Sequence, residues 1–202
     1  MRVGVLASGA GTNLQAILDR LHGHHGVEVV AVGSDQPSAP ALARARKADV
    51  PTAVFALAEH AGRAERDAAM ADWLAEQGAE LVVLAGYMQL LDPGFLARFP
   101  LRIVNVHPAL LPAFPGLQAI EQALAYGVKV FGVTVHFVDE GVDTGPIIAQ
   151  RALELPEATE PARVREALRP LEHDLLCEAV ALLARGAVTI DPAHTRRVVV
   201  VR

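Results

Sequence analysis

The chain has 202 residues, of which 52% are hydrophobic, 20% are charged and only 4% are aromatic. This length is enough to bury the core of an α/β domain, which with so few aromatic residues must consist mainly of Ala, Val and Leu. The formal net charge of -5 argues against nucleic acid as a main partner, because phosphate-backbone binding needs a basic surface. The single cysteine, Cys177, excludes an internal disulfide and a cysteine-rich metal site.

Membrane and export signals are not found in the sequence. No segment approaches the uninterrupted apolar run of about 20 residues that a membrane-spanning helix needs. The apolar run at the N-terminus is too short for a signal peptide, and glycines follow it at once. The sequence therefore predicts a cytoplasmic protein with no membrane partner.

In the first half of the chain, short Val-rich runs alternate with longer stretches rich in Ala, Leu, Arg and Glu. This alternation is typical of a parallel sheet flanked by helices. The expected strands are residues 3–7, 27–33, 51–55 and 81–85, and the expected helices are residues 13–22, 39–47 and 63–77. The first half, residues 1–100, is therefore predicted to be a Rossmann-like unit.

The second half, residues 101–202, departs from this regular alternation. A strand at 101–107 is followed by a Pro- and Gly-rich loop at 108–116. A helix at 118–125, strands at 129–138 and 146–153, a helix at 160–185 and a closing edge hairpin of 187–190 with 197–201 complete the expected elements. Pro170 is expected to kink or split the long helix. The predicted fold class is α/β, a mostly parallel twisted sheet with helices on both faces and a modified C-terminal half, in one domain spanning 1–202.

The glycine-containing segment after the first strand, residues 8–14, leads directly into a helix. Glycines allow close approach of the backbone to a ligand, and a helix N-terminus favours an anion, so the segment suits a phosphate. It lacks the third Gly or Ala of the dinucleotide fingerprint, a position held by Leu14, and it lacks the Lys of a Walker loop. A plain strand–helix turn capped by Thr12 or Asn13 explains the segment equally well.

Asn105 and His107 lie two residues apart at the end of a predicted strand, so their side chains share one face. Open α/β sheets bind their ligands at this carboxyl edge. An amide donor beside an imidazole suits stabilisation of an oxyanion together with proton transfer. An isolated pair of this kind more often satisfies local backbone groups, although the stiff loop that follows favours a site.

An acidic, Gly-containing loop joins the two later strands, and it carries Asp143. A carboxylate near an imidazole stabilises the imidazolium, so Asp143 is a plausible partner for His107. Asp139 and Glu140 are expected to be solvated loop charges. His136 lies within an apolar strand, where packing in the core or behind the site is the favoured role.

Several motifs occur in the order and spacing of the glycinamide ribonucleotide (GAR) transformylase family, which the chain resembles over most of its length. The family is also called phosphoribosylglycinamide formyltransferase. The motifs are Ser-Gly-Ala-Gly-Thr-Asn-Leu-Gln, Val-Leu-Ala-Gly-Tyr-Met, Asn-Val-His-Pro-Ala-Leu-Leu-Pro, Phe-Pro-Gly, Gly-Val-Thr-Val-His-Phe-Val and Asp-Thr-Gly-Pro-Ile-Ile. Some members of the family carry Arg where Gln89 stands and Lys where Ala113 stands.

The resemblance implies transfer of a formyl group from 10-formyltetrahydrofolate, as cosubstrate, to the amine of GAR in purine biosynthesis, without a metal. It implies four sets of residues in this chain. These are the catalytic residues Asn105, His107 and Asp143, the substrate-phosphate loop Gly11, Thr12 and Asn13, the folate contacts Arg63, Met88, Gln89, Leu90, Leu91 and Asn105, and a further substrate contact, Glu172. A homodimer is compatible with the sequence.

Three other functions remain open from the sequence. A 10-formyltetrahydrofolate deformylase has a similar catalytic half but usually an additional N-terminal regulatory domain. A methionyl-tRNA formyltransferase shares the Asn-x-His motif but has a second, RNA-binding domain. A non-catalytic nucleotide-binding Rossmann module explains the glycine segment but leaves the ordered Asn, His and Asp motifs unexplained.

Overall fold

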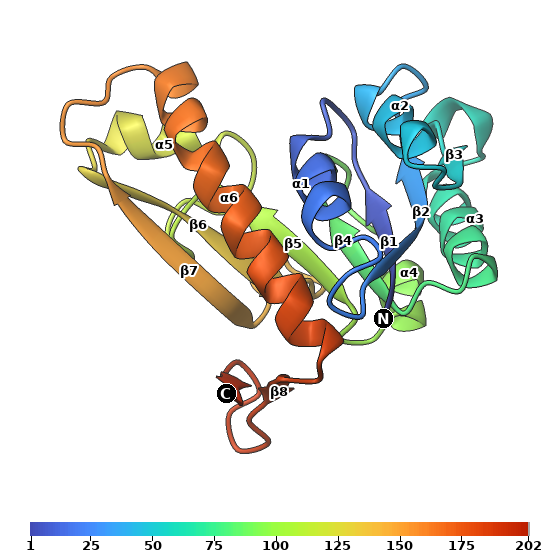
Figure 1. Ribbon diagram of the computed structural model, residues 1–202. Coiled ribbons are helices and arrows are strands. Elements are labelled where there is room, and N and C mark those ends of the chain that lie inside the picture. The colour runs from blue at the N-terminus through green and yellow to red at the C-terminus, as the bar shows by residue number, and fades with distance from the viewer. Residues whose placement is uncertain (202) are drawn as a thin grey trace. The chain divides into compact units, whose positions relative to one another are not determined.

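The computed structural model describes residues 1–201, which divide into two compact units, Met1–Asn105 and the described chain from Val106 onward (Figure 1). The elements of the first unit are β1 (Arg2–Leu6), α1 (Thr12–Arg20), β2 (Glu28–Ser34), α2 (Pro40–Lys47), β3 (Thr52–Val54), the short 3-10 helix η1 (Leu57–Glu59), α3 (Arg63–Glu76), β4 (Leu81–Leu84), α4 (Pro93–Arg98) and most of β5 (Ile103–His107). No helix within residues 1–201 is both long and apolar enough to cross a membrane.

The first unit is built on a parallel sheet with the strand order β3-β2-β1-β4-β5. Consecutive side chains of a strand point to opposite faces. Because all four residues of β4 are buried, and so are the last four of β1, both faces of the sheet are covered. The parallel strands and the helices between them confirm the predicted fold class, a Rossmann-like α/β fold.

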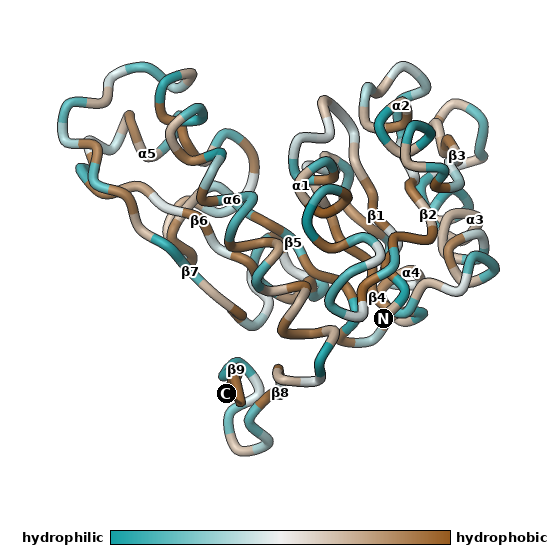
Figure 2. The backbone as a smooth tube through the Cα atoms, viewed as in Figure 1, coloured by the Kyte–Doolittle hydropathy of each residue, from teal (hydrophilic) through white to brown (hydrophobic). Residues whose placement is uncertain are grey.

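The core of this unit consists of small aliphatic side chains, as the composition predicted. Val3, Val5, Leu81 and Val83 are fully buried on the central strands. Figure 2 shows β1 and β4 in the hydrophobic colour, while the helices alternate between hydrophobic and hydrophilic residues. Burial of apolar surface on the sheet, at about 25 cal/mol per Å², is therefore the main source of stability in this unit.

Helix α4 was not predicted from the sequence, although the residues at its beginning are typical of a helix start. The side chain of Asp92 caps the helix by accepting a hydrogen bond from the Gly94 amide at 2.9 Å, and Pro93 occupies the first turn. An Asp-Pro pair is a common way to begin a helix. The helix has only six residues, too few to show a clear apolar periodicity.

The second unit contains the end of β5 followed by α5 (Ala119–Tyr126), β6 (Val130–Phe137), β7 (Ile147–Glu154), α6 (Pro161–Ala184), β8 (Val188–Ile190) and β9 (Val198–Val200). The end of β5 neighbours β6, and β6 pairs with β7 in the antiparallel direction, with Thr134 opposite Gln150. Helix α6 packs along β6 and β7 (Figure 1). The modified C-terminal half is thus an antiparallel continuation covered by one long helix, and the sheet as a whole is mostly parallel.

Of the two outcomes predicted for Pro170, a kink or a split of the long helix, the structure excludes the split. Helix α6 runs from Pro161 to Ala184 with Pro170 inside it. Proline lacks an N–H, which leaves the carbonyl of Glu166 without its helical donor. Pro170 and Glu166 are both exposed, so that carbonyl is on a side of the helix that water can reach, while Leu168 and Leu175 are buried on either side of the proline and hold the helix together.

The closing hairpin forms as predicted, but as a separate sheet. Strands β8 and β9 pair with each other, Val188 opposite Val200, and make a two-stranded sheet of their own. An isolated bridge between Ile147 and Arg197 connects this segment to the start of β7. The hairpin therefore flanks the sheet edge without extending its ladder.

Candidate functional site

The glycine loop after β1 contains one position, Gly11, whose backbone conformation favours glycine. Gly11 has a φ of 70°, in the left-handed region, and a Cβ atom at this position would lie 2.7 Å from the Cβ of Ala41. Arg44 fixes the loop from α2, because its Nε donates to the carbonyl of Ala10 at 2.8 Å. The loop therefore leads into α1 at residues 11–13 in a close backbone turn, where a helix N-terminus can bind an anion.

A second loop follows β4 at the same edge of the first unit. The amide of Ser8 donates to the carbonyl of Gly86 at 3.1 Å, and the amide of Met88 donates to the hydroxyl of Ser8 at 2.9 Å. The glycine loop and the segment after β4 are therefore joined by two hydrogen bonds. Asn105 lies opposite Leu84 in the ladder of β5 with β4, so it too reaches this carboxyl edge.

The other residues of the expected folate set vary in exposure. Met88 and Leu90 are large apolar side chains that are 64% and 59% exposed, whereas Gln89 and Leu91 are half-buried. Arg63 is exposed at the beginning of α3. Two apolar side chains exposed so close together form a surface that a flat aromatic ligand can cover.

In the second unit the structure brings His107 and Asp143 into contact. The Nδ1 atom of His107 lies 3.2 Å from Oδ2 of Asp143, and its Nε2 atom lies 2.8 Å from the carbonyl oxygen of Phe114. The His107 side chain is 6% exposed, and both of its ring nitrogens lie close to oxygen atoms. These two contacts fix the orientation of the ring.

His136 approaches the other side of the same carboxylate. Its Nε2 atom lies 3.5 Å from Oδ1 of Asp143, and its Nδ1 atom lies 2.8 Å from the carbonyl oxygen of Phe137. The amide of Gly116 adds a third contact, donating to Oδ2 of Asp143 at 2.8 Å. Asp143 is therefore restrained by two histidines and one backbone amide.

These contacts decide the ionisation of Asp143. Burial acts to raise the pKa of its carboxyl, but the hydrogen bonds from His136 and Gly116 and the charges of His107 and His136 outweigh burial and lower the pKa to about 2. Asp143 also has a φ of 53°, which non-glycine residues seldom adopt. A carboxylate that stays ionised and is held in one position can keep a neighbouring imidazole protonated.

Two close approaches fix the loops that carry these groups. A Cβ atom at Gly145 would overlap the carbonyl oxygen of Phe137, so the turn containing Asp143 lies directly against the end of β6. Thr134 of β6 fixes the loop after β5, because its hydroxyl donates to the carbonyl of Ala109 at 2.7 Å and accepts from the amide of Leu111 at 3.1 Å.

His136 was predicted to pack in the core or behind the site, and the second of these is what the structure shows. It is only 1% exposed, so the expectation of burial was correct, but the ring contacts Asp143 rather than apolar core alone. A signal was present in the strand. Thr134 and His136 alternate with Val133, Val135 and Phe137, so two polar side chains share one face of an otherwise apolar strand.

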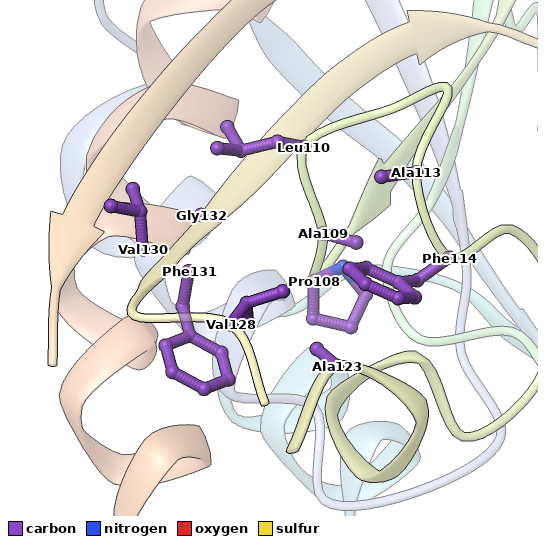
Figure 3. A pocket seen from close by; sticks show the side chains of 10 residues that line it. All are labelled: Pro108, Ala109, Leu110, Ala113, Phe114, Ala123, Val128, Val130, Phe131 and Gly132. Atoms are coloured by element: carbon purple, nitrogen blue, oxygen red, sulfur yellow. The ribbon is translucent and has the colours of Figure 1, made fainter. Parts of the chain in front are cut away.

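Glu172 is the one expected substrate contact on α6, where it is half-buried. A separate cavity of about 150 Å³ lies behind the loop that follows His107 (Figure 3). Its ten lining residues, which include Leu110, Phe114 and Phe131, carry no ionisable side chain. The cavity is thus apolar and distinct from the His107–Asp143 pair. Among residues 1–201, no group of three His, Cys, Asp or Glu side chains is placed to hold a metal ion.

Comparison with known proteins agrees with this geometry. Residues 1–180 match the model of the formyl transferase family. A phosphoribosylglycinamide formyltransferase from Mycobacterium tuberculosis is 46% identical over 189 residues, covering 94% of this chain and 87% of that protein. The crystal structure of glycinamide ribonucleotide transformylase 1 from Symbiobacterium toebii matches with a TM-score of 0.95 at 47% identity, covering 100% of this chain and 94% of the other.

A more distant structure is informative because its function differs. A formyltetrahydrofolate deformylase from Pseudomonas syringae matches with a TM-score of 0.90 at 25% identity, and this chain covers 66% of its length. The fold alone therefore does not separate transfer from hydrolysis, whereas the identity and the coverage do favour the transformylases. The chain belongs to the formyl transferase family, and within that family it resembles the phosphoribosylglycinamide formyltransferases.

Proposed function

We propose that this protein transfers the formyl group of 10-formyltetrahydrofolate to the amine of GAR, giving formyl-GAR and tetrahydrofolate in purine biosynthesis. The observation that carries the proposal is the contact between His107 and the ionised carboxylate of Asp143, with His107 two residues beyond Asn105 on β5. An amide donor and a carboxylate-supported imidazole suit acyl transfer. The whole chain then acts as one formyltransferase domain.

In the proposed reaction the amine nitrogen of GAR attacks the formyl carbon. The Asn105 side-chain amide and the protonated ring of His107 donate hydrogen bonds to the formyl oxygen as negative charge develops on it. Asp143 keeps His107 protonated and, through water, passes the proton of the attacking amine to the folate nitrogen. The bond between the formyl carbon and that nitrogen then breaks, and no covalent bond to the enzyme forms.

The chain offers complementary surfaces for both substrates. We assign the phosphate of GAR to the backbone at Gly11, Thr12 and Asn13, because a helix begins there and Gly11 permits close approach. We assign the cosubstrate to the segment after β4, where Met88 and Leu90 expose apolar side chains that an aromatic ring system can cover. Arg63, Gln89 and Leu91 complete that contact set, and Glu172 supplies a further contact to GAR.

The decisive experiment measures tetrahydrofolate release from 10-formyltetrahydrofolate with and without GAR. The proposal predicts release that depends on GAR and yields one formyl-GAR for each tetrahydrofolate. Release without GAR would identify a deformylase, the alternative that the Pseudomonas syringae structure makes relevant. No release under either condition would favour a non-catalytic binding module. The cytoplasmic location and a homodimer stay predictions from the sequence.

A further inference from the structure

The segment from Tyr87 to Asp92, which carries four of the assigned folate contacts, is held to the rest of the first unit by polar side chains. The Gln89 side chain donates from Nε2 to Oδ2 of the buried Asp35 at 3.1 Å. The carbonyl of Leu90 faces the guanidinium of Arg66, with an oxygen-to-nitrogen distance of 3.5 Å. The amide of Asp92 donates to Oδ2 of Asp67 at 2.7 Å. The segment is thus restrained at several points along its length.

Arg66 and Asp67 form an ion pair that is almost entirely removed from solvent. Their side chains are 1% and 0% exposed, and Oδ1 of Asp67 lies 2.7 Å from one guanidinium nitrogen and 2.8 Å from Nε. The carboxylate uses one oxygen for Arg66 and the other for the amide of Asp92. The pair therefore connects α3 to both ends of the Leu90–Asp92 stretch.

A buried ion pair is a weak source of stability, because the cost of removing two charges from water offsets much of their attraction. What it does provide is fixed geometry, since each partner has one arrangement that satisfies it. Tyr87, at the start of the segment, lies near enough for these charges to affect the pKa of its phenol. Burial raises the pKa of its phenol, Arg66 opposes that shift, and Asp67 and Asp35 add to it.

We infer that Asp67 is a positioning residue for the folate cosubstrate, acting through Arg66 and the Asp92 amide to hold the Tyr87–Asp92 segment in its binding conformation. The inference rests on the proposed function. Groups that bind a substrate must be held within about 0.5 Å of their productive geometry by their supporting contacts. Releasing the segment lowers affinity for the cosubstrate without touching the GAR phosphate loop.

The test is the double variant Arg66→Met with Asp67→Asn, which removes both charges and leaves neither partner buried alone. The new carboxamide can still accept a hydrogen bond from the Asp92 amide, while the polar contact to Leu90 is lost. We expect a folded protein whose KM and equilibrium Kd for 10-formyltetrahydrofolate rise about tenfold, with KM for GAR unchanged. Asp67→Ala, which also removes the acceptor for Asp92, is expected to weaken folate binding further.

The matched control is Asp72→Asn. Asp72 lies on the same helix α3 and also pairs with α4, since its Oδ1 lies 2.7 Å from a guanidinium nitrogen of Arg98, but both side chains are exposed and neither belongs to the segment. This variant should keep the wild-type folate KM.

Either of two results overturns the inference. A folded double variant with wild-type folate affinity shows that the pair has no positioning role, and a double variant that fails to fold shows that the pair serves the fold. Direct titration of 10-formyltetrahydrofolate in the absence of GAR separates the two proposals. Wild-type protein that binds folate but transfers nothing to GAR contradicts the proposed function only.

Discussion

The Nδ1 atom of His107 lies 3.2 Å from Oδ2 of Asp143, at the end of β5, and this distance places a carboxylate directly behind an imidazole. The contact joins residues 36 positions apart, so it exists only because β6 and the turn after it return to the end of β5. Its electrostatic consequence is that the positive charge of His107 and the negative charge of Asp143 stabilise each other.

Replacing Asp143 by Asn removes this charge while preserving the shape of the side chain. We expect turnover to fall by a factor on the order of 100 or more, because His107 loses the charged group that orients its ring. Steady-state tetrahydrofolate release with saturating GAR measures the effect. Glu140→Gln, an exposed charge in the same loop, is the control and should retain wild-type turnover. Wild-type turnover in Asp143→Asn would refute the assignment.

Asn105→Ala and His107→Ala each remove one of the two proposed donors to the developing oxyanion. Loss of one such donor typically lowers turnover by about 100- to 1000-fold. We expect this loss in both variants, with a folded protein and near-normal GAR binding, because the phosphate of GAR is assigned to a different loop. Single-turnover kinetics measure the rate of formyl transfer in each variant, and calorimetry measures its affinity for GAR. The assignment fails if both variants turn over like wild type.

The lowered pKa of Asp143 predicts how its contribution to stability varies with pH. A carboxyl whose pKa is lower in the folded state stabilises the fold above its unfolded pKa and loses this effect as the pH falls through its folded pKa. With a shift from 3.8 to about 2, the loss falls between about pH 4 and pH 2. A carbon-13 NMR titration of the Asp143 carboxyl should therefore show a midpoint near 2. A midpoint near 4 would mean that the two histidines do not hold the charge.

Gly11→Ala should impair both the fold and GAR binding. A left-handed conformation costs a non-glycine residue roughly 1–2 kcal/mol, and the new Cβ would lie 2.7 Å from that of Ala41. We expect a lower Tm and a raised KM for GAR. Adding Ala41→Gly removes the Cβ of residue 41, but its backbone Cα would still lie 2.8 Å from the new Cβ and the backbone strain would remain. The second substitution should therefore recover only a small part of the loss in Tm. Gly9→Ala, whose Cβ would meet nothing within 4 Å, should leave the Tm unchanged.

Local signals predicted most of the fold. The alternation of Val-rich runs with helical stretches located the strands and the long helices to within a few residues, because burial on both faces of a parallel sheet requires continuous apolar strands. Helix α4 was not predicted because six residues are too few to show the apolar periodicity of a helix. Whether Pro170 splits its helix could not be predicted, because its cost to the helix depends on whether water can reach the carbonyl of Glu166, which is a property of the packed molecule.

The residues of the candidate site were likewise only partly predictable from the sequence. Asn105 and His107 were recognisable from their spacing at a strand end, and ordered motifs allowed the family resemblance to point to Asp143. His136 was predicted to pack either in the core or behind the site, because a histidine in an apolar strand is usually buried. The sequence alone does not say which of these two it does, and the structure places it against Asp143. Nothing in the sequence pointed to a role for Asp67. Besides the neighbouring Arg66, its hydrogen-bond partner is the amide of Asp92, which lies in a loop more than 20 residues away.

By itself, the sequence determined the order of strands and helices, the glycine loop and the Asn-x-His pair at the end of β5. These features depend on residues close together in the chain, and the periodicity or spacing of those residues can be read directly. Only the tertiary structure decided that Asp143 lies between two histidines and that Asp67 holds the Leu90–Asp92 stretch. Both arrangements depend on which distant segments meet and on how much water is left between them, and those quantities exist only once the chain is packed.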